Sequence, residues 1–253
     1  MSLTFASLWN QFILAAALAR TARPFAERAK DDLIDFVYVD THAGPGRYDG
    51  SLPGLQHVCD QGPSILNRAM LEAYHSGLGQ GHLGSWLLAG RVLGRVGGTQ
   101  MAVEMDVNDL SPAIIEQAKA NREGGWVRLW SHDWFLFLRS TLNRLNLPHF
   151  VFIDPPADDH RGPAYAIDAA ILLDTMSVPY MVTYPVAGCQ TSIDEIGRTG
   201  LELLDHHGNG CGALLGGGAE TVLLEIMGDL TRLAEALNGH FYARLPQSVD
   251  YMI

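Results

Sequence analysis

The sequence predicts a single α/β domain whose sheet is mostly parallel and carries helices on both faces. Short runs of residues that suit buried strands alternate with segments of helical periodicity along most of the chain. The chain has 253 residues, of which 47% are hydrophobic and 18% charged, so it can bury a sizeable core. We therefore treat residues 1–253 as one domain.

The first expected element is an amphipathic helix. Apolar residues from Phe5 to Ala16 follow the i, i+3, i+4 spacing of a helix that covers a sheet. Because proline disfavours helix continuation, we expect this helix to end at Pro24. A buried strand follows at 36–39 and ends in Asp40.

Residues 49–98 are expected to form an inserted subdomain. The segment 49–85 is rich in glycine, histidine and proline and has weak periodicity. A plain doubly wound sheet would reach its second strand much sooner. A helix from Leu87 to Val96 would complete the insertion.

The rest of the chain continues the alternation of strands and helices. A short strand is expected at 101–103, ending in Glu104, and Ser111-Pro112 begins a helix with favourable capping chemistry. Further strands are expected at 126–130, 150–153, 180–184, 213–215 and 240–245, and further helices at 135–145, 167–176, 193–206 and 222–237.

The net charge argues against general nucleic-acid binding. The chain carries 28 acids against 17 bases, a formal charge of −11, whereas phosphate contacts need clustered lysine and arginine. The three separate cysteines form no CxxC pair, and this predicts a reducing, cytoplasmic location. The apolar run from Phe12 to Ala19 is too short to span a membrane, and no basic residue precedes it, so we expect no secretory signal.

Four acids follow consecutive predicted strands: Asp40, Glu104, Asp133 and Asp154. Such acids lie together along the carboxyl edge of a parallel sheet, where open α/β folds bind ligands. Each acid alone has a simpler interpretation, because Glu104 or Asp133 could cap the helix that follows it. The four together favour a ligand that carries hydroxyl and amine groups.

Two glycine-containing loops could contact a ligand. In the first, Asp40 is followed by Gly44 and Gly46, which relieve φ constraints between a strand and a helix. The second, 79–84, matches GxGxxG but follows no strand, so an ordinary flexible loop is expected. The sequence has no GxSxG elbow or Walker loop, and its histidines lack metal-ligand spacing, so we expect no metal.

The segment 150–157 places Asp154, Pro155 and Pro156 at the end of a buried strand. In DNA and RNA amino-methyltransferases, a similar Asp-Pro-Pro-aromatic sequence binds an exocyclic amine, and its aromatic residue stacks on the flipped base. The run 38–48 closely resembles the first motif of the RlmJ family. These are bacterial S-adenosylmethionine (SAM)-dependent enzymes that methylate the N(6) amine of one adenine in large-subunit ribosomal RNA. The similarity continues in order at Ser85, Glu104, Asp133, Asp154-Pro155-Pro156 and 184–186.

The resemblance implies a Rossmann-like SAM-dependent methyltransferase fold, SAM as cofactor and ribosomal RNA as partner. It makes Asp154 the catalytic acceptor for the target amine, beside the Pro155 carbonyl, with Pro156 in the substrate site. The cofactor contacts that it implies are Asp40, His42, Gly44, Gly46, Ser85, Glu104, Asp133 and Trp134.

The sequence departs from the family at two places. Ala157 stands where the motif has an aromatic residue, so Tyr165 or Tyr184 would have to contact the base instead. Asn10-Gln11 stand where the family has a Lys-His pair. The leading hypothesis is a SAM-dependent amino-methyltransferase acting on adenine in nucleic acid. One alternative is a SAM methyltransferase for a small-molecule or protein amine, and the other is a non-catalytic SAM-binding or interaction protein.

Overall fold

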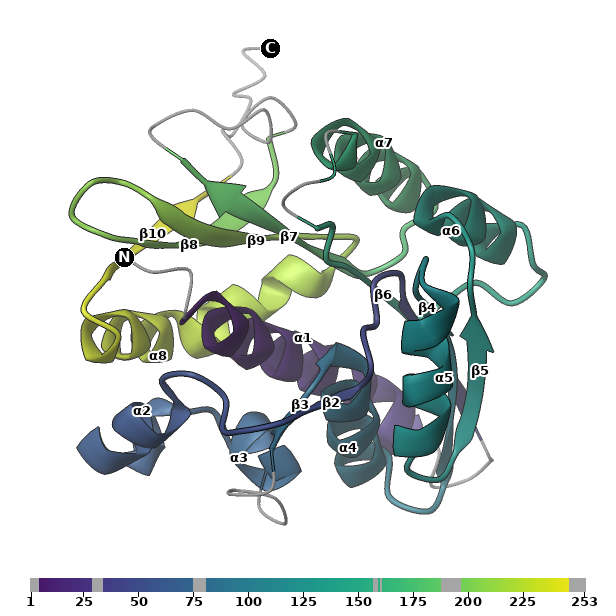
Figure 1. Ribbon diagram of the computed structural model, residues 1–253, viewed down its shortest axis with the longest axis horizontal. Helices are drawn as coiled ribbons and strands as arrows, with labels where there is room; N and C mark the ends of the chain where they lie inside the picture. The colour runs from purple at the N-terminus through teal and green to yellow at the C-terminus, as the bar shows by residue number, and fades with distance from the viewer. Residues whose placement is uncertain are drawn as a thin grey trace.

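The computed structural model describes residues 5–28, 34–74, 81–156, 159, 161–187 and 197–245. Its main sheet has eight strands in the order β10-β8-β9-β7-β6-β1-β4-β5 (Figure 1). These strands are β1 (Ile34–Asp40), β4 (Met101–Asn108), β5 (Trp126–Trp130), β6 (Phe150–Ile153), β7 (Tyr180–Val186), β8 (Thr199–Leu204), β9 (Gly210–Gly216) and β10 (His240–Arg244). Five neighbouring strands are parallel to one another: β5, β4, β1, β6 and β7. Strand β9 is antiparallel to β7 and β8, and β10 is antiparallel to β8. The predicted α/β fold with a mostly parallel sheet is confirmed.

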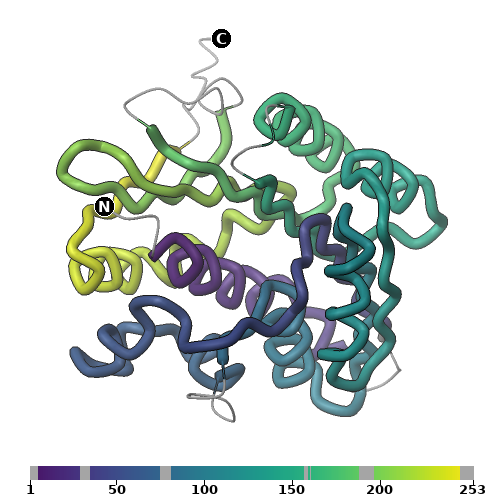
Figure 2. Tube along the Cα trace, viewed as in Figure 1, coloured from purple at the N-terminus to yellow at the C-terminus, as the bar shows by residue number. Residues whose placement is uncertain are grey.

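Helices cover both faces of the sheet. They are α1 (Ala6–Arg28), α2 (Leu55–Gln61), η2 (Pro63–Ile65), α3 (Arg68–Tyr74), α4 (Ser85–Gly97), α5 (Pro112–Asn121), α6 (Trp134–Leu142), α7 (Gly162–Thr175), η4 (Ala219–Val222) and α8 (Leu223–Ala236). Side chains alternate between two cores: Tyr38 and Phe152 join α1 and α4, whereas Val39 and Ile153 join α6 and α7. Figure 2 shows the purple N-terminal helix running through the middle of the molecule, beside the blue and yellow segments.

Helix α1 is longer than predicted. It continues for a further turn beyond Pro24, so the prediction that it ends there is wrong. The proline has no N–H to donate to the carbonyl of Arg20. This carbonyl belongs to an exposed part of the helix, where water can donate the hydrogen bond instead. The turn beyond Pro24 is held by Phe25, whose ring packs edge-on against Phe36 of β1 at 5.3 Å.

Strand β4 also extends further than predicted, to Asn108. Glu104 therefore lies in mid-strand, and the prediction that it ends the strand is wrong. Its carboxylate is tolerated there because Arg128 of β5 donates hydrogen bonds to both Glu104 and Asp106, each at 2.9 Å. The acid that follows the carboxyl end of β4 is Asp109.

The helix expected at 193–206 is wrong where the structure describes it. Residues 199–204 form β8, which pairs with β9 on one side and β10 on the other. Leu201 and Leu203 join the core beneath α1, whereas the Glu202 carboxylate bonds to Tyr184 in the other core, a period of two that suits a strand. Residues 193–196 of the expected helix lie outside the described residues.

The other predicted strands and helices are confirmed, with shifted ends. The segment 49–98 contains α2, η2, α3, the short strand β3 (His82–Leu83) and α4. Helix α4 packs against α1, α3 and β4, and so belongs to one of the two layers that cover the sheet. The inserted subdomain as a separate unit stays a prediction.

Strand β9 is rich in glycine because two tyrosine rings of β7 lie across it. A Cβ atom at Gly212 would overlap the ring of Tyr184, and one at Gly216 would overlap the ring of Tyr180. The Tyr184 hydroxyl also donates a hydrogen bond to the buried carboxylate of Glu202 at 3.0 Å, so this ring has little freedom to move aside.

Replacing Gly212 by alanine is expected to destabilise the fold by about 1–3 kcal/mol, the usual effect of overpacking a core. Gly228 offers a matched control, because it is exposed within α8 and an added Cβ has no neighbour within 4 Å. Gly228→Ala is expected to stabilise the protein by up to about 1 kcal/mol through helix propensity. Urea denaturation of both variants checks this, and equal effects would contradict the packing explanation.

Candidate functional site

The carboxyl ends of β1 and its neighbours surround Asp40. Its side chain is fully buried and accepts hydrogen bonds from the Ser85 hydroxyl at 2.5 Å, the Tyr38 hydroxyl at 3.1 Å and the His42 backbone N–H at 3.2 Å. Burial raises the pKa of Asp40 to about 7, although the three hydrogen bonds act in the opposite direction. The structure thus brings together the predicted residues Asp40, His42 and Ser85.

The turn after β1 contains Gly44 and Gly46, whose φ angles are 59° and 81°. The Gly44 N–H donates a hydrogen bond to the Asp109 carboxylate at 3.2 Å. A Cβ atom at Gly46 would overlap the ring of Trp86 in α4. The turn is therefore held between the end of β4 and α4, and the acid beside it is Asp109 rather than Glu104.

A cavity of about 320 Å³ lies beside this cluster. Its polar lining comes from α1, the turn after β1, the start of α4 and the end of β6, and includes Asn10, Gln11, His42, Ser85 and Asp154. The cavity therefore joins the Asn10-Gln11 segment to the Asp-Pro-Pro segment. Its volume lies within the range of small-ligand sites, and its lining is more polar than is usual for them.

Asp154 is reached from the cavity, and its carboxylate accepts a hydrogen bond from the Thr183 hydroxyl of β7. Asp154 as a residue is exposed to solvent, yet the protein packed around its carboxylate raises its pKa, while the Thr183 bond lowers it. The Pro156 carbonyl accepts a hydrogen bond from the Asp159 N–H at 3.0 Å, and the first residue of α7 packs against Pro155. The Asp-Pro-Pro segment is thereby held between β6 and α7.

The tautomer of His42 follows from its neighbour Thr41. The Thr41 hydroxyl donates to the Phe152 carbonyl at 3.2 Å, and its oxygen lies 2.8 Å from Nδ1 of His42. The hydroxyl has one proton, so when it donates to Phe152, Nδ1 donates in the second contact and Nε2 is left as an acceptor. Nε2 is buried and has no hydrogen-bond partner among the described residues. Burial lowers the pKa of His42 to about 4, so the ring is neutral at pH 7.

Asp133 and Trp134 adjoin this region. Asp133 caps α6, since its carboxylate accepts hydrogen bonds from two backbone N–H groups of the first turn at 3.1 and 3.0 Å. The Trp134 ring centroid lies 5.1 Å from that of His42. Tyr165 stacks on Phe135, with ring centroids 4.8 Å apart, and its ring also contacts Trp134 at 6.2 Å.

Two predicted residues lie elsewhere. Glu104 lies in the middle of β4 and forms an ion pair with Arg128 of the edge strand β5. Tyr184 is 6% exposed and bonds to Glu202 in the core, so it does not line the cavity. It therefore cannot supply the aromatic contact that Ala157 lacks. Ala157 itself lies outside the described residues.

Four residues in this region were not predicted as site residues from the sequence: Asp109, Thr183, Tyr48 and His82. Asp109 follows the observed end of β4, whereas the sequence suggests that this strand ends at Glu104. The difference arises because acids within a strand can be neutralised by a neighbouring strand. Thr183 is a hydroxyl residue in an otherwise apolar strand, which is a weak signal. The pairing of Tyr48 with His82 crosses the inserted segment, and no local pattern indicates it.

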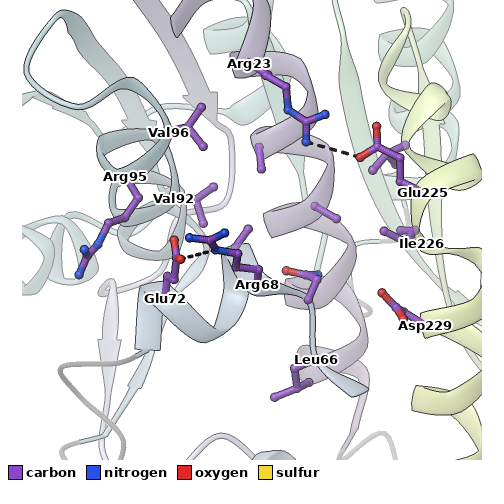
Figure 3. A pocket seen from close by; sticks show the side chains of 15 residues that line it. Arg23, Leu66, Arg68, Glu72, Val92, Arg95, Val96, Glu225, Ile226 and Asp229 are labelled. Carbon is purple, nitrogen blue, oxygen red and sulfur yellow. Dashed lines mark hydrogen bonds and ion pairs between the residues drawn. The ribbon is translucent and has the colours of Figure 1, made fainter. Parts of the chain in front are cut away.

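A second cavity, of about 460 Å³, is a groove between α1, α3, α4 and α8 (Figure 3). Its floor is mainly apolar, and ion pairs flank it: Arg68 with Glu72 at 2.6 Å and Arg23 with Glu225 at 3.6 Å. None of the four acids that the sequence placed at strand ends lines this groove. Although it is larger, its paired charges offer less chemistry than the cavity at Asp154.

No family model matches the sequence, and a comparison with curated proteins finds no match either. Among solved structures, protein LPL1258 from Legionella pneumophila, described under family model DUF519, has a TM-score of 0.67 at 16% identity, covering 94% of this chain and 97% of that one. HI0767 from Haemophilus influenzae, a methylase candidate, has a TM-score of 0.36 at 14% identity, covering 72% and 79%. A candidate class I SAM-dependent methyltransferase from Listeria monocytogenes, lmo1582, has a TM-score of 0.45 at 11% identity, covering 89% and 70%. The first similarity shows the fold over nearly the whole chain.

Within the described ranges, no helix is both long and apolar enough to cross a membrane. The same part of the chain contains no group of three or more His, Cys, Asp or Glu side chains placed to hold a metal ion.

Proposed function

We propose that the protein is a SAM-dependent N-methyltransferase. The observation that carries the proposal is Asp154, which follows a central parallel strand and faces a polar cavity beside the turn 40–46. Open α/β sheets bind their ligands at this edge. The resemblance of the run 38–48 and of the Asp-Pro-Pro segment to RlmJ enzymes supports the same reaction.

The residues present fit SAM. This cofactor carries a sulfonium, an ammonium and ribose hydroxyls, and the carboxylates of Asp40 and Asp109 border the turn Gly44–Gly46. The buried Nε2 of His42 has no hydrogen-bond partner among the described residues, so a polar group of a ligand could bond to it. These residues would hold the cofactor, with Asp109 in the place foreseen for Glu104. When bound, SAM would supply an electrophilic methyl group.

Asp154 would act on the acceptor amine. Its carboxylate, held by Thr183, would accept one amine hydrogen, and the Pro155 carbonyl would accept the other. This arrangement directs the nitrogen lone pair at the methyl carbon. Methyl transfer from bound SAM would leave the amine with a surplus N–H proton, which Asp154 or water would take up. The rate would come mainly from positioning.

Two classes of acceptor are compatible with this chemistry. The resemblance to RlmJ enzymes supports the N(6) amine of adenine in ribosomal RNA. The net charge of −11, and the lack of any Lys or Arg among the described residues that line the cavity, favour a small uncharged acceptor instead. Both classes would use Asp154 in the same way.

Calorimetric titration with SAM and with S-adenosylhomocysteine at pH 6 and pH 8 tests this function. SAM carries a net positive charge, and Asp40, with its pKa raised to about 7, is mostly protonated at pH 6 and mostly ionised at pH 8. Because a cation favours the ionised carboxylate, SAM affinity is expected to rise roughly tenfold between the two conditions. S-adenosylhomocysteine lacks the sulfonium charge and should respond less.

The variant Asp40→Asn is the control for this experiment, since it should remove the difference between pH 6 and pH 8. If neither compound binds in either condition, the methyltransferase function is wrong, and the protein is better regarded as an interaction protein. Binding of SAM with no dependence on pH would contradict only the part assigned to Asp40.

A further inference from the structure

The small two-stranded sheet of β2 (Arg47–Tyr48) and β3 places two rings face to face at the cavity. Tyr48 pairs with His82 across this small sheet, and their rings stack with centroids 4.8 Å apart and planes 9° from parallel. Both side chains line the cavity that contains Asp154. The pair, called here the Tyr48–His82 wall, gives this cavity a stack of two aromatic rings that a third planar ring could extend.

Close backbone contacts fix the Tyr48–His82 wall. The Gly84 N–H donates to the Gly46 carbonyl at 2.6 Å and so ties the small sheet of β2 and β3 to the turn after β1. A Cβ atom at Gly81 would overlap the Tyr48 carbonyl, and one at Gly44 would overlap the Tyr48 hydroxyl. The tyrosine ring consequently rests on the glycine turn. Figure 1 shows β2 and β3 side by side, near α1 and α4.

The Tyr48–His82 wall lies close to the acids and presents a neutral phenol. Burial raises the pKa of Tyr48 to about 12, and the charges of Asp40, Asp154 and Asp109 act in the same direction. The phenol is therefore neutral at pH 7. Since no Lys or Arg is found among the described residues of the lining, the cavity suits an uncharged ring better than a phosphate.

We propose that Tyr48 and His82 form the surface on which the acceptor ring lies, so that the enzyme selects amines attached to a planar heteroaromatic ring. This inference rests on the proposed function, because Asp154 would hold the amine while the wall holds the ring. It gives the small sheet of β2 and β3 the stacking role that Ala157 cannot have. An aliphatic amine would gain no stacking energy there. The ring could belong to a free nucleoside or to a nucleotide in RNA.

Fluorescence of 2-aminopurine riboside, an adenosine analogue that is quenched when it stacks, tests the wall directly. The wild-type protein is expected to quench it. Tyr48→Leu and His82→Ala should each bind it about tenfold more weakly, or worse, because stacking is lost. Tyr48→Phe keeps the ring and should resemble the wild type. Tyr242→Leu and His240→Ala, on β10 and outside the cavity lining, are matched controls.

Titration of the same proteins with SAM keeps the two proposals apart. SAM binding with riboside quenching that is unchanged in Tyr48→Leu and His82→Ala would overturn the wall, as would no quenching by the wild type. Quenching that depends on Tyr48 in a protein unable to bind SAM would support the wall and remove the methyltransferase function. Thermal melting checks each variant, and His82→Ala decides the matter if Tyr48→Leu fails to fold.

A single-stranded oligoribonucleotide with one 2-aminopurine distinguishes the two sources of the ring. Tighter binding than that of the riboside would indicate a nucleotide in RNA. Equal or weaker binding would indicate a free acceptor of nucleoside size. Either result supports the wall if Tyr48→Leu removes the quenching, and contradicts it if Tyr48→Leu does not.

Discussion

Asp154→Ala is expected to abolish measurable methyl transfer, a loss of about 10²–10³-fold or more, because the amine loses the group that orients it. SAM affinity should change by less than about tenfold, since the bond described for the Asp154 carboxylate goes to Thr183 and not to the glycine turn. The measurement is transfer of a tritiated methyl group from SAM to adenosine and to an adenine-containing oligoribonucleotide, with SAM affinity determined by calorimetry.

Two further variants sharpen this test. Asp154→Asn keeps one acceptor oxygen and should retain more activity than the alanine variant. Asp168→Ala removes an exposed acid from α7 and should behave like the wild type. Unchanged turnover in Asp154→Ala would refute the part assigned to this carboxylate, whereas a parallel loss of SAM binding would move Asp154 into the cofactor site.

Gly46→Ala is expected to destabilise the protein by about 2–5 kcal/mol. A residue with a Cβ atom costs about 1–2 kcal/mol in the left-handed region, where Gly46 has a φ of 81°. Overlap of the new methyl group with the Trp86 ring adds about 1–3 kcal/mol. Urea denaturation measures the loss of stability, and SAM binding should weaken with it because the turn must move.

Gly50→Ala separates the two contributions. Gly50 has a similar φ of 77°, but an added Cβ there has no neighbour within 4 Å. It should therefore show the conformational cost alone, about 1–2 kcal/mol. If Gly46→Ala were no worse than Gly50→Ala, the proposed packing of the turn against α4 would be wrong.

The central strands could be predicted from sequence because both of their faces are buried, which leaves continuous apolar runs at 36–39 and 150–153. The end of β4 could not, since Glu104 and Asp106 read as loop residues until Arg128 of the next strand neutralises them. The strand at 199–204 could not be predicted either. Its side chains alternate between the two cores, and this pattern is recognised only once both cores are known.

Only some residues of the candidate site could likewise be predicted from the sequence. Asp40, His42 and Ser85 could be placed together through motif resemblance, and the hydrogen bonds of Asp40 agree with that placement. The partners that depend on long-range pairing, Thr183 for Asp154 and His82 for Tyr48, could not. The first contact depends on the register of β6 and β7, and the second on the pairing of β2 with β3. Local residue patterns encode neither.

The opposite displacements of the Asp40 and His42 pKa values have a consequence for folding itself. Asp40 rises from 3.8 to about 7, so the folded chain holds a proton that the unfolded chain has lost, and stability falls as the pH rises through this range. His42 falls from 6.5 to about 4, so the folded chain lacks a proton that the unfolded chain holds, and stability rises with pH. Where the two windows overlap, the proton taken up by one residue is released by the other. Folding therefore exchanges almost no net proton through this pair under mildly acidic conditions, and the two residues together add little to the pH dependence of stability there.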